Sequence, residues 1–319
     1  MANRYFAGNS LASFSRTATA IVEVTTAGRF DSAYVSSAIT FSGSPPDYLQ
    51  TPTFTATGTI WTHYEFYYGS NLASTWTWFK FVNGATDVFQ LVMSGSNLQP
   101  QYWNGSAWVN TGTSISFSAT SSRLVVDLKV VLNSGFELYL GGTLVASGSG
   151  WSGGGTTVTA AQIKSASNGG ASNAISQVMI ADYDLRSSKY MAAALNGNSA
   201  SNTGGTGAYT DINETVLDES TSEKVTTSTN KMGQTHAAIT VPSGYIIAAM
   251  AIGARGRVTG TITDGKLGIR SGGSNYSSTG RTYNAGYEPR VYISDTDPNT
   301  ATQFTQTGFN NAETYIEAV

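Results

Sequence analysis

The sequence predicts an all-β protein, and three observations support that class. Strand-like segments recur about every eight to twelve residues from residue 28 onward, as in sandwiches and barrels. Turn residues separate these segments, and glycine is abundant, with 35 copies in 319 residues. Charged residues make up only 12% of the chain. Short, evenly spaced strands of this kind are typical of a β-sandwich and not of alternating βαβ units.

The clearest strand pattern lies at residues 123–147, "RLVVDLKVVLNSGFELYLGGTLVAS". From Leu124 to Leu132, aliphatic residues alternate with a second set that includes Asp127 and Lys129. A period of two predicts that the first set is buried and that the two charged side chains point to water. Asn133-Ser134-Gly135 and Gly141-Gly142 supply residues for two tight turns. We therefore predict a β-meander here.

Other strand candidates precede and follow the meander. "IWTHYEFYYG", "TWTWFKFV" and "DVFQLVMS" are followed by "LQPQYW" and "AWVNTG", which meet across Asn104-Gly105, a strong hairpin signal. "SQVMIADYDLR" ends this part of the chain. The composition then changes near Arg186 to small and polar residues, which indicates a boundary.

We expect three parts in the chain. Residues 1–28 form an N-terminal arm or an entering strand, residues 29–186 form a sandwich, and residues 187–319 form a smaller β-sandwich or jelly roll. In the last part, "YIIAAMAIGARGRV", "GKLGIRSG" and "TYIEAV" are strand candidates. We expect no helix longer than a turn or two, and only "KYMAAAL" has some helical propensity.

Composition excludes several classes of function. The net charge of −3, without a Lys/Arg cluster, argues against a nucleic-acid partner. The absence of cysteine excludes disulfides and thiolate metal sites. No run of apolar residues is long enough to insert into a membrane. The N-terminus "MANRYFAGNS" lacks the apolar segment of a signal peptide, so cell lysis is the expected route to the outside.

Two resemblances narrow the expectation. At "LVVDLKVVLNSGFELYLGGTLVASG" the chain resembles the concanavalin A-like and laminin G-like sandwiches, over roughly residues 28–186. "ISQVMIADYDLR", "AMAIGARGRV" and "DPNTATQFTQTGFNNAETYIE" look like segments of tailed-phage virion proteins that pair a lectin-like sandwich with a C-terminal β-domain.

The resemblance to virion proteins implies a function and a location. It implies a non-enzymatic component of a phage particle, in a fibre, spike or head-decoration position, which is made in the host cytoplasm and exposed on the particle after lysis. Its implied partners are other virion structural proteins, further copies of itself in a homotrimer, and host-surface glycan during adsorption. No cofactor is implied.

A polysaccharide-cleaving depolymerase is the alternative from another class. It would need two carboxylates that line one cleft, about 5 to 10 Å apart. Glu65 and Glu137 each stand alone on their strands, whereas Asp182 and Asp184 share one strand face. The only Asp-x-x-Glu pair, at Asp211, falls in a loop-like region. Structural or solvated roles are the favoured interpretation of these carboxylates.

Neither the two histidines nor the segment that resembles a calcium loop predicts a catalytic or metal-binding site. His63 and His236 lie in ordinary strand contexts, without a Gly-x-Ser-x-Gly elbow. Asp295, Asp297 and Asn299 alternate as calcium ligands can, but Pro298 interrupts them and an Asp-Pro turn is the better interpretation. We therefore expect no metal site.

Aromatic side chains are the candidates for glycan contact, because exposed Trp and Tyr rings stack on the apolar faces of sugars. Two groups stand out: Trp76 and Trp78, which share one strand face with Lys80, and the cluster around the Asn104-Gly105 turn, formed by Tyr102, Trp103 and Trp108. The alternative is that these rings pack in the core or against a neighbouring subunit. The latter case predicts a purely structural capsid or tail tile that binds no ligand.

The N-terminal segment contains candidates for an anchor. Arg4, Tyr5, Phe6 and Phe14 would dock onto another structural protein. An ordinary first strand is the equally supported alternative.

Overall fold

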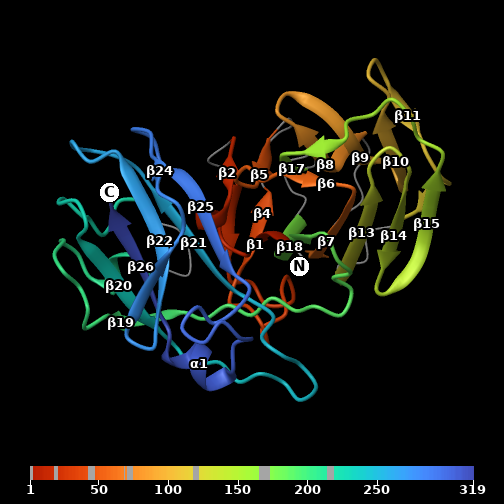
Figure 1. Cartoon of the computed structure of the whole chain (residues 1–319). Coiled ribbons are helices and arrows are strands. Elements are labelled where there is room, and N and C mark those ends of the chain that lie inside the picture. Colours follow the sequence, from red (N-terminus) through yellow and green to blue (C-terminus); the bar gives the residue numbers. More distant parts are fainter. Residues whose placement is uncertain are drawn as a thin grey trace. The chain divides into compact units, whose positions relative to one another are not determined.

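The computed structural model describes residues 3–17, 21–41, 47–67, 69, 75–117, 122–164, 173–213 and 219–319. The chain divides into two compact units, Met1–Met191 (unit 1) and Ala192–Val319 (unit 2). Regular structure is almost entirely strand in both, as Figure 1 shows, and the predicted all-β class is confirmed.

Unit 1 is built from two large antiparallel sheets. In order across the sheet, sheet A contains β15 (Thr143–Ser149), β14 (Gly135–Leu140), β13 (Arg123–Val131), β7 (Thr59–Tyr67), β18 (Asn173–Ala181), β4 (Ala38–Phe41) and β3 (Ile21–Val24), and β1 (Arg4–Gly8) also pairs with β18. Sheet B contains β11 (Trp108–Asn110), β10 (Asn97–Trp103), β9 (Thr86–Ser94), β8 (Trp76–Asn83), β17 (Ala160–Lys164), β5 (Tyr48–Gln50) and β2 (Ser15–Arg16), and β12 (Ile115–Ser116) also pairs with β10. A two-stranded sheet, β16 (Thr157–Val158) with β6 (Ala56–Thr57), and the short helix η1 (Leu11–Ser13) complete the unit.

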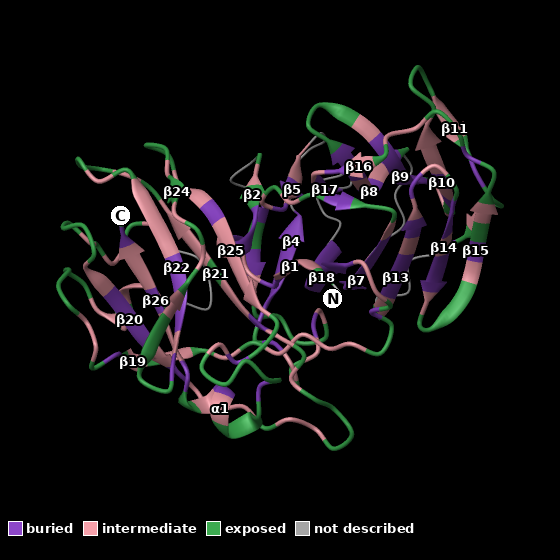
Figure 2. Cartoon of the chain, in the orientation of Figure 1, coloured by how far each residue is buried: buried purple, intermediate pink, exposed green. Residues whose placement is uncertain are grey.

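Aromatic side chains join the two sheets into a sandwich. From sheet A, Tyr64 and Phe66 contact Trp78 of sheet B, with ring centroids 6.0 and 4.7 Å apart. Nearer the other end, Phe136 of sheet A lies 5.6 Å from Phe89 of sheet B. Figure 2 shows buried residues along β7, β13 and β18 of sheet A, which is where this core lies. The predicted sandwich is confirmed.

The β-meander is confirmed, but the prediction that Asp127 faces water is wrong. β13, β14 and β15 pair in sequence order, and Val126, Leu128 and Val130 are fully buried between the sheets. Asp127, expected to face water, is only 1% exposed. It lies on the outer face of sheet A, which other parts of unit 1 cover.

The expectation that Trp76, Trp78 and Lys80 share one exposed face is also wrong. A β-bulge between Thr77 and Phe79 shifts the register of β8 against β9. Trp76 and Trp78 both lie in the core, at 5% and 0% exposure, whereas Lys80 is half-buried on the outer face. A bulge adds one residue to one strand and so changes the alternation of side chains beyond it.

The N-terminal segment belongs to the sandwich, so the anchor interpretation needs correction for two of its four residues. β1 pairs with β18 inside sheet A. Phe6 and Phe14 are buried and contact each other, with ring centroids 4.9 Å apart. Tyr5 stacks on Phe54 at 5.5 Å, and the Arg4 guanidinium lies over the ring of Tyr183. Buried phenylalanine rings cannot dock onto another protein.

Unit 2 is a smaller β-unit with its own core. Its six-stranded sheet runs β19 (Leu195–Asn198), β20 (Lys231–His236), β26 (Glu313–Ala318), β22 (Asp264–Ser271), β23 (Ser274–Ser277), with β24 (Arg281–Thr282) also paired to β22. In a separate two-stranded ribbon, β21 (Met250–Gly256) pairs with β25 (Glu288–Ser294). Unit 2 also contains two short helices, η2 (Tyr209–Asp211) and α1 (Gln306–Asn311). The core contains residues of β21, of β22 and of the α1 region: Met250, Ile269, Phe304, Phe309 and Ala312.

Helix α1 was not predicted from the sequence. It begins at Gln306, where the Thr305 hydroxyl accepts a hydrogen bond from the Gly308 amide at 2.9 Å, a standard N-cap. Phe309 is its one buried residue and packs against Phe304. The segment "KYMAAAL" forms no helix, and Leu195 at its end begins β19.

Candidate functional site

The hairpin of β10 and β11 carries two partly exposed tryptophans. Trp103 and Trp108 lie opposite each other at its end, with ring centroids 5.6 Å apart and rings at 72°. The turn between them is held by Asn104, whose side-chain oxygen accepts from the amides of Ser106 and Ala107. The predicted hairpin is confirmed, and its tip keeps the two indole rings in a fixed arrangement.

Tyr102, the third residue of the predicted cluster, faces the opposite way. Its ring stacks on Trp151 at 5.4 Å, and Trp151 in turn stacks on Phe89. Trp151 is buried, at 4% exposure. Tyr102 therefore supports the hairpin from the core side and does not share the outer face with Trp103 and Trp108.

A glycine-rich loop supports the same hairpin from behind. A Cβ atom on Gly154 would lie 3.0 Å from the Trp103 carbonyl oxygen, and one on Gly153 would lie 3.1 Å from the Asn104 carbonyl oxygen. Such approaches are tighter than ordinary contacts, so residues without a side chain let the loop lie directly against the hairpin backbone. The "SGSGWSGGG" stretch is thus a support for the tip.

Next to the tryptophans, a line of polar side chains crosses sheet B. We call it the polar row. Strand pairing places its members directly opposite one another on six neighbouring strands: Gln50, Gln162, Lys80, Gln90, Gln101 and Asn110. Residues directly opposite in a sheet project to the same side. Trp103 and Trp108 are two residues along β10 and β11 from Gln101 and Asn110, so they project to that side as well.

Hydrogen bonds connect the members of the polar row. Gln90 donates to Gln101 at 2.7 Å, and Gln101 donates to Asn110 at 2.8 Å. At the other end, Gln162 donates to Gln50 at 2.9 Å. Between these groups, Lys80 is ion-paired with Asp87, and its ammonium group lies 5.7 Å from the centre of the Trp108 ring. The row and the indole pair thus form one continuous surface.

The outer face of sheet A is polar as well, but it is closed around His63 and Asp127, whereas Lys129 and Glu137 stay partly exposed. His63 and Asp127 are hydrogen-bonded at 2.7 Å, and both are at most 1% exposed. The Arg186 guanidinium covers the neighbouring rings of Trp61 and Tyr139, at 5.2 and 4.5 Å from their centres. Leu185 is buried in the same cluster. The segment that follows β18 therefore shields the part of this face around Trp61 and Tyr139 from solvent.

The carboxylates considered for catalysis are held in structural contacts. Glu65 pairs with Arg123 at 3.2 Å, and Asp182 accepts two hydrogen bonds from Asn3. Glu137 accepts from Lys129 and from the Tyr139 hydroxyl, and these bonds hold the pKa of its carboxyl below the usual value.

Asp184 is held in the same way. Its ion pair with Arg186 lowers the pKa of its carboxyl. Glu214, the partner of Asp211 in the Asp-x-x-Glu pair, lies outside the described residues.

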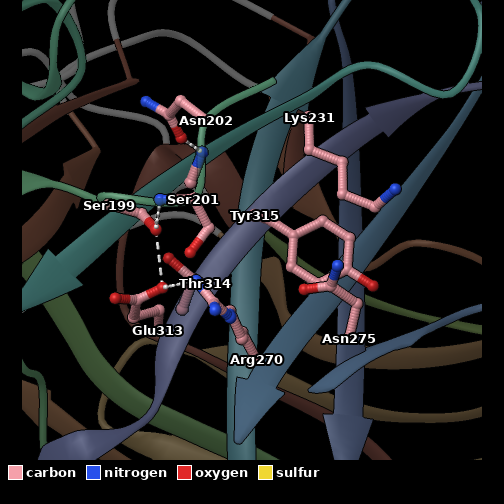
Figure 3. Close-up of a pocket in the computed structure, with 10 residues that line it drawn as sticks. Ser199, Ser201, Asn202, Lys231, Arg270, Asn275, Glu313, Thr314 and Tyr315 are labelled. Atoms are coloured by element: carbon pink, nitrogen blue, oxygen red, sulfur yellow. Dashed lines mark hydrogen bonds and ion pairs between the residues drawn. The ribbon is translucent and has the colours of Figure 1, made fainter. Parts of the chain in front are cut away.

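A small pocket in unit 2, shown in Figure 3, is lined mostly by polar side chains. Ser199 donates to Glu313 at 2.6 Å, and Arg270 approaches the same carboxylate at 3.5 Å. Tyr315 closes one side, and burial raises the pKa of its hydroxyl to about 12. Ser199 and Arg270 thus both bind the Glu313 carboxylate inside the pocket.

The predicted Asp-Pro turn is present in unit 2. Asp297 is buried, accepts from the Ser271 hydroxyl at 2.7 Å and accepts from the Asn299 amide at 3.0 Å. Across the described ranges, no group of three or more His, Asp or Glu side chains is placed to hold a metal ion. None of the helices in those ranges is long and apolar enough to span a membrane.

The sequence did not reveal the polar row. Each of its amides is the one row member in a separate strand segment: "YLQ", "AAQI", "VFQLV", "PQYW" or "WVN". Taken alone, each looks like an ordinary residue on the outer face of a strand. The two-residue turn at Gly95-Ser96 would have aligned Gln90 with Gln101. The pairing of Gln50 with Gln162 joins distant parts of the chain and had no local signal.

Comparisons with known proteins give limited similarity. The sequence matches no protein-family model and no curated protein. Among solved structures, it is similar to the globular domain of T. cruzi calreticulin, with TM-score 0.44, 13% identity, and coverage of 57% of this chain and 89% of that one.

Two toxin domains and a lyase are also similar. The binding domain of Paraclostridial Mosquitocidal Protein 1 has TM-score 0.43 and 11% identity, with coverage of 58% of this chain and 50% of that one. The receptor binding domain of the botulinum neurotoxin C/D mosaic has TM-score 0.40 and 9% identity, with coverage of 54% and 44%. Alginate lyase AlgAT5 of polysaccharide lyase family 7 has TM-score 0.35 and 11% identity, with coverage of 53% and 94%. The chain thus spans half or less of the toxin domains, and at these scores no functional argument rests on any of the four.

Proposed function

We propose that unit 1 is a non-enzymatic glycan-binding module. The observation that carries this proposal is the pair of partly exposed indole rings, Trp103 and Trp108, beside a row of fixed amide groups on one sheet face. Aromatic rings stack on the apolar faces of sugars, and amides donate to and accept from sugar hydroxyls. The two kinds of contact are the ones that a sugar ring requires.

The site is ordered before any ligand arrives. Trp151 and the glycine-rich loop support the hairpin tip, and neighbouring side chains orient the amides of Gln90 and Gln101. A preorganised surface spends less of its interaction free energy on ordering its own side chains when it binds. Weak contacts per sugar can therefore still give measurable affinity.

A non-enzymatic role of unit 1 is supported by the state of two of its acidic side chains. A glycosidase needs one carboxylic acid that stays protonated near neutral pH, which requires a raised pKa. The Glu137 and Asp184 carboxyls instead have lowered pKa values, because Lys129 and Arg186 bind them. In unit 2, burial raises the pKa of Glu223 to about 7, but its carboxylate accepts a hydrogen bond from the Gln234 side chain, a structural contact.

We further propose that the protein is part of a phage particle, as a fibre, spike or head decoration that contacts host-surface glycan. The support is the resemblance of the sequence to tailed-phage virion proteins. A homotrimer on a particle would multiply weak glycan contacts into strong adsorption. The mass of the purified chain by light scattering tests this part: three times the chain mass is the expected result, and a monomer at all concentrations would contradict it.

Glycan-array binding tests the glycan proposal. We expect the purified full chain to bind a subset of glycans, and the Trp103→Ala, Trp108→Ala double variant to lose that binding. Tyr245→Ala is the matched control, because it removes a 42% exposed aromatic ring from unit 2. Runs with and without calcium would reveal a metal requirement. A wild-type chain that binds no glycan would overturn the proposal and favour the purely structural tile.

A further inference from the structure

We infer that the polar row is a binding track for one neutral, ribbon-like polysaccharide chain, which lies across the strands of sheet B. This inference rests on the proposed glycan binding and adds the direction, length and class of the ligand.

The register gives the track its length. Gln50, Gln162, Lys80, Gln90, Gln101 and Asn110 occupy six consecutive strands without an offset. Neighbouring strands lie about 4.8 Å apart, so the five intervals span about 24 Å. This is the length of an oligosaccharide of several units and far exceeds one sugar ring. A single monosaccharide could touch only one or two members.

The hydrogen bonds leave capacity for a ligand. Each glutamine amide has two N–H donors and an oxygen that accepts twice. Gln101 donates one hydrogen bond to Asn110 and accepts one from Gln90, so one N–H and one acceptor position remain. Gln162 spends one donor on Gln50. Gln90 is buried and is bound to Thr77 and Gln101, so it orients its neighbours and is not offered to a ligand. The partly exposed members on both sides of it offer donors and acceptors to the hydroxyls of a repeating chain.

The shape of the surface selects the chain. Neighbouring strands of a sheet are rotated by about 20 to 25°, so the row is an extended and gradually twisting line of side chains. The indole pair at its β10–β11 end stacks on a sugar face free of axial hydroxyls. Chains with equatorial linkages, such as β-1,4-linked glucans, are extended ribbons with two such faces. Chains of α-1,4-linked glucose coil and would leave an extended track after a short contact.

The charge of the row favours a neutral chain. Lys80, at the middle of the row, is already ion-paired with Asp87 and lies near the Trp108 ring. An acidic sugar placed there would have to compete with the Asp87 carboxylate. A hydroxyl, in contrast, can accept from the Lys80 ammonium without breaking that pair, because an ammonium has three donors.

Calorimetric titration with soluble oligosaccharides tests the track. We expect the affinity of the full chain for β-1,4-linked gluco-oligosaccharides to rise from the disaccharide to the hexasaccharide, and malto-oligosaccharides of equal length to bind more weakly. Gln162→Ala, far from the indole pair, should weaken hexasaccharide binding about three- to tenfold, the value of one hydrogen bond. It should leave disaccharide binding unchanged.

Two controls separate the track from the indole site. Gln303→Ala removes an exposed amide from unit 2 and should change nothing. The Trp103→Ala, Trp108→Ala variant should lose binding of every length. Equal affinity for short and long chains, an inert Gln162→Ala variant, or malto-oligosaccharides that bind as well would each overturn the track while glycan binding at the indole pair stands. A chain that binds neither these oligosaccharides nor any array glycan would overturn both proposals.

Discussion

Replacing Asp127 tests the role of the closed polar face of sheet A. The Asp127 carboxylate lies 2.7 Å from Nδ1 of His63, and the two side chains are 1% and 0% exposed. The other ring nitrogen, Nε2, has no hydrogen-bond partner in the described structure. Asp127→Ala would therefore leave a fully buried imidazole without any hydrogen bond.

The structure sets the size of the effect. Breaking a buried pair by removing one partner costs about 3 to 5 kcal/mol, because the other polar group stays buried and unsatisfied. Asp127→Asn keeps an oxygen near Nδ1 and should cost less. Replacing both residues, as in His63→Leu with Asp127→Leu, removes both polar groups and should recover much of the loss.

Tryptophan fluorescence during urea unfolding is the suitable assay. All six tryptophans lie in unit 1, so their fluorescence reports on that unit alone. Since the two side chains touch, the double-mutant cycle should show a coupling of about 1 to 3 kcal/mol. An Asp127→Ala variant that loses less than about 1 kcal/mol, or effects that simply add, would refute the reasoning.

Three further predictions concern other parts of the chain. Burial raises the pKa of Glu223 to about 7, so the folded state binds more protons than the unfolded state between about pH 4.5 and 7. The free energy of unfolding of unit 2, measured by calorimetry, should therefore fall as pH rises through that window. The Glu223→Gln variant should show a flatter dependence on pH. Gly154→Ala should displace the Trp103 carbonyl and weaken glycan binding, whereas Gly286→Ala, which meets nothing within 4 Å, should not. Phe14→Ala should cost unit 1 about 3 to 5 kcal/mol in urea unfolding, as for a core ring, and a change below about 1 kcal/mol would restore the anchor interpretation.

Features with local signals were predictable from the sequence. The meander at 123–149 and the hairpin at Asn104-Gly105 depend on alternation and on turn residues that lie next to each other in the chain. The strand class of unit 2 was evident for the same reason. The partial exposure of Trp103 and Trp108 at the tip also followed from a local argument, because a hairpin end is difficult to bury.

Features that depend on distant contacts were not predictable. Asp127 follows the alternation of its strand, but a segment far along the chain covers that face of the sheet. Trp78 points inward because a β-bulge changes the register of β8. No residue type in "TWTWFKFV" indicates a bulge at that position. The polar row requires β5 and β17 to pair, although more than a hundred residues separate Gln50 from Gln162.

The polar row also constrains how this protein can change over evolutionary time. Its members face one another only while the two-residue turn at Gly95-Ser96 keeps its length, because a slip of one residue would turn Gln101 inward and Tyr102 outward. The Asn104–Ala107 turn lies beyond the last rung of the ladder and is free of that constraint. Substitutions within the row and insertions at the tip are therefore the changes that alter the chemistry of this surface while the strand register is kept.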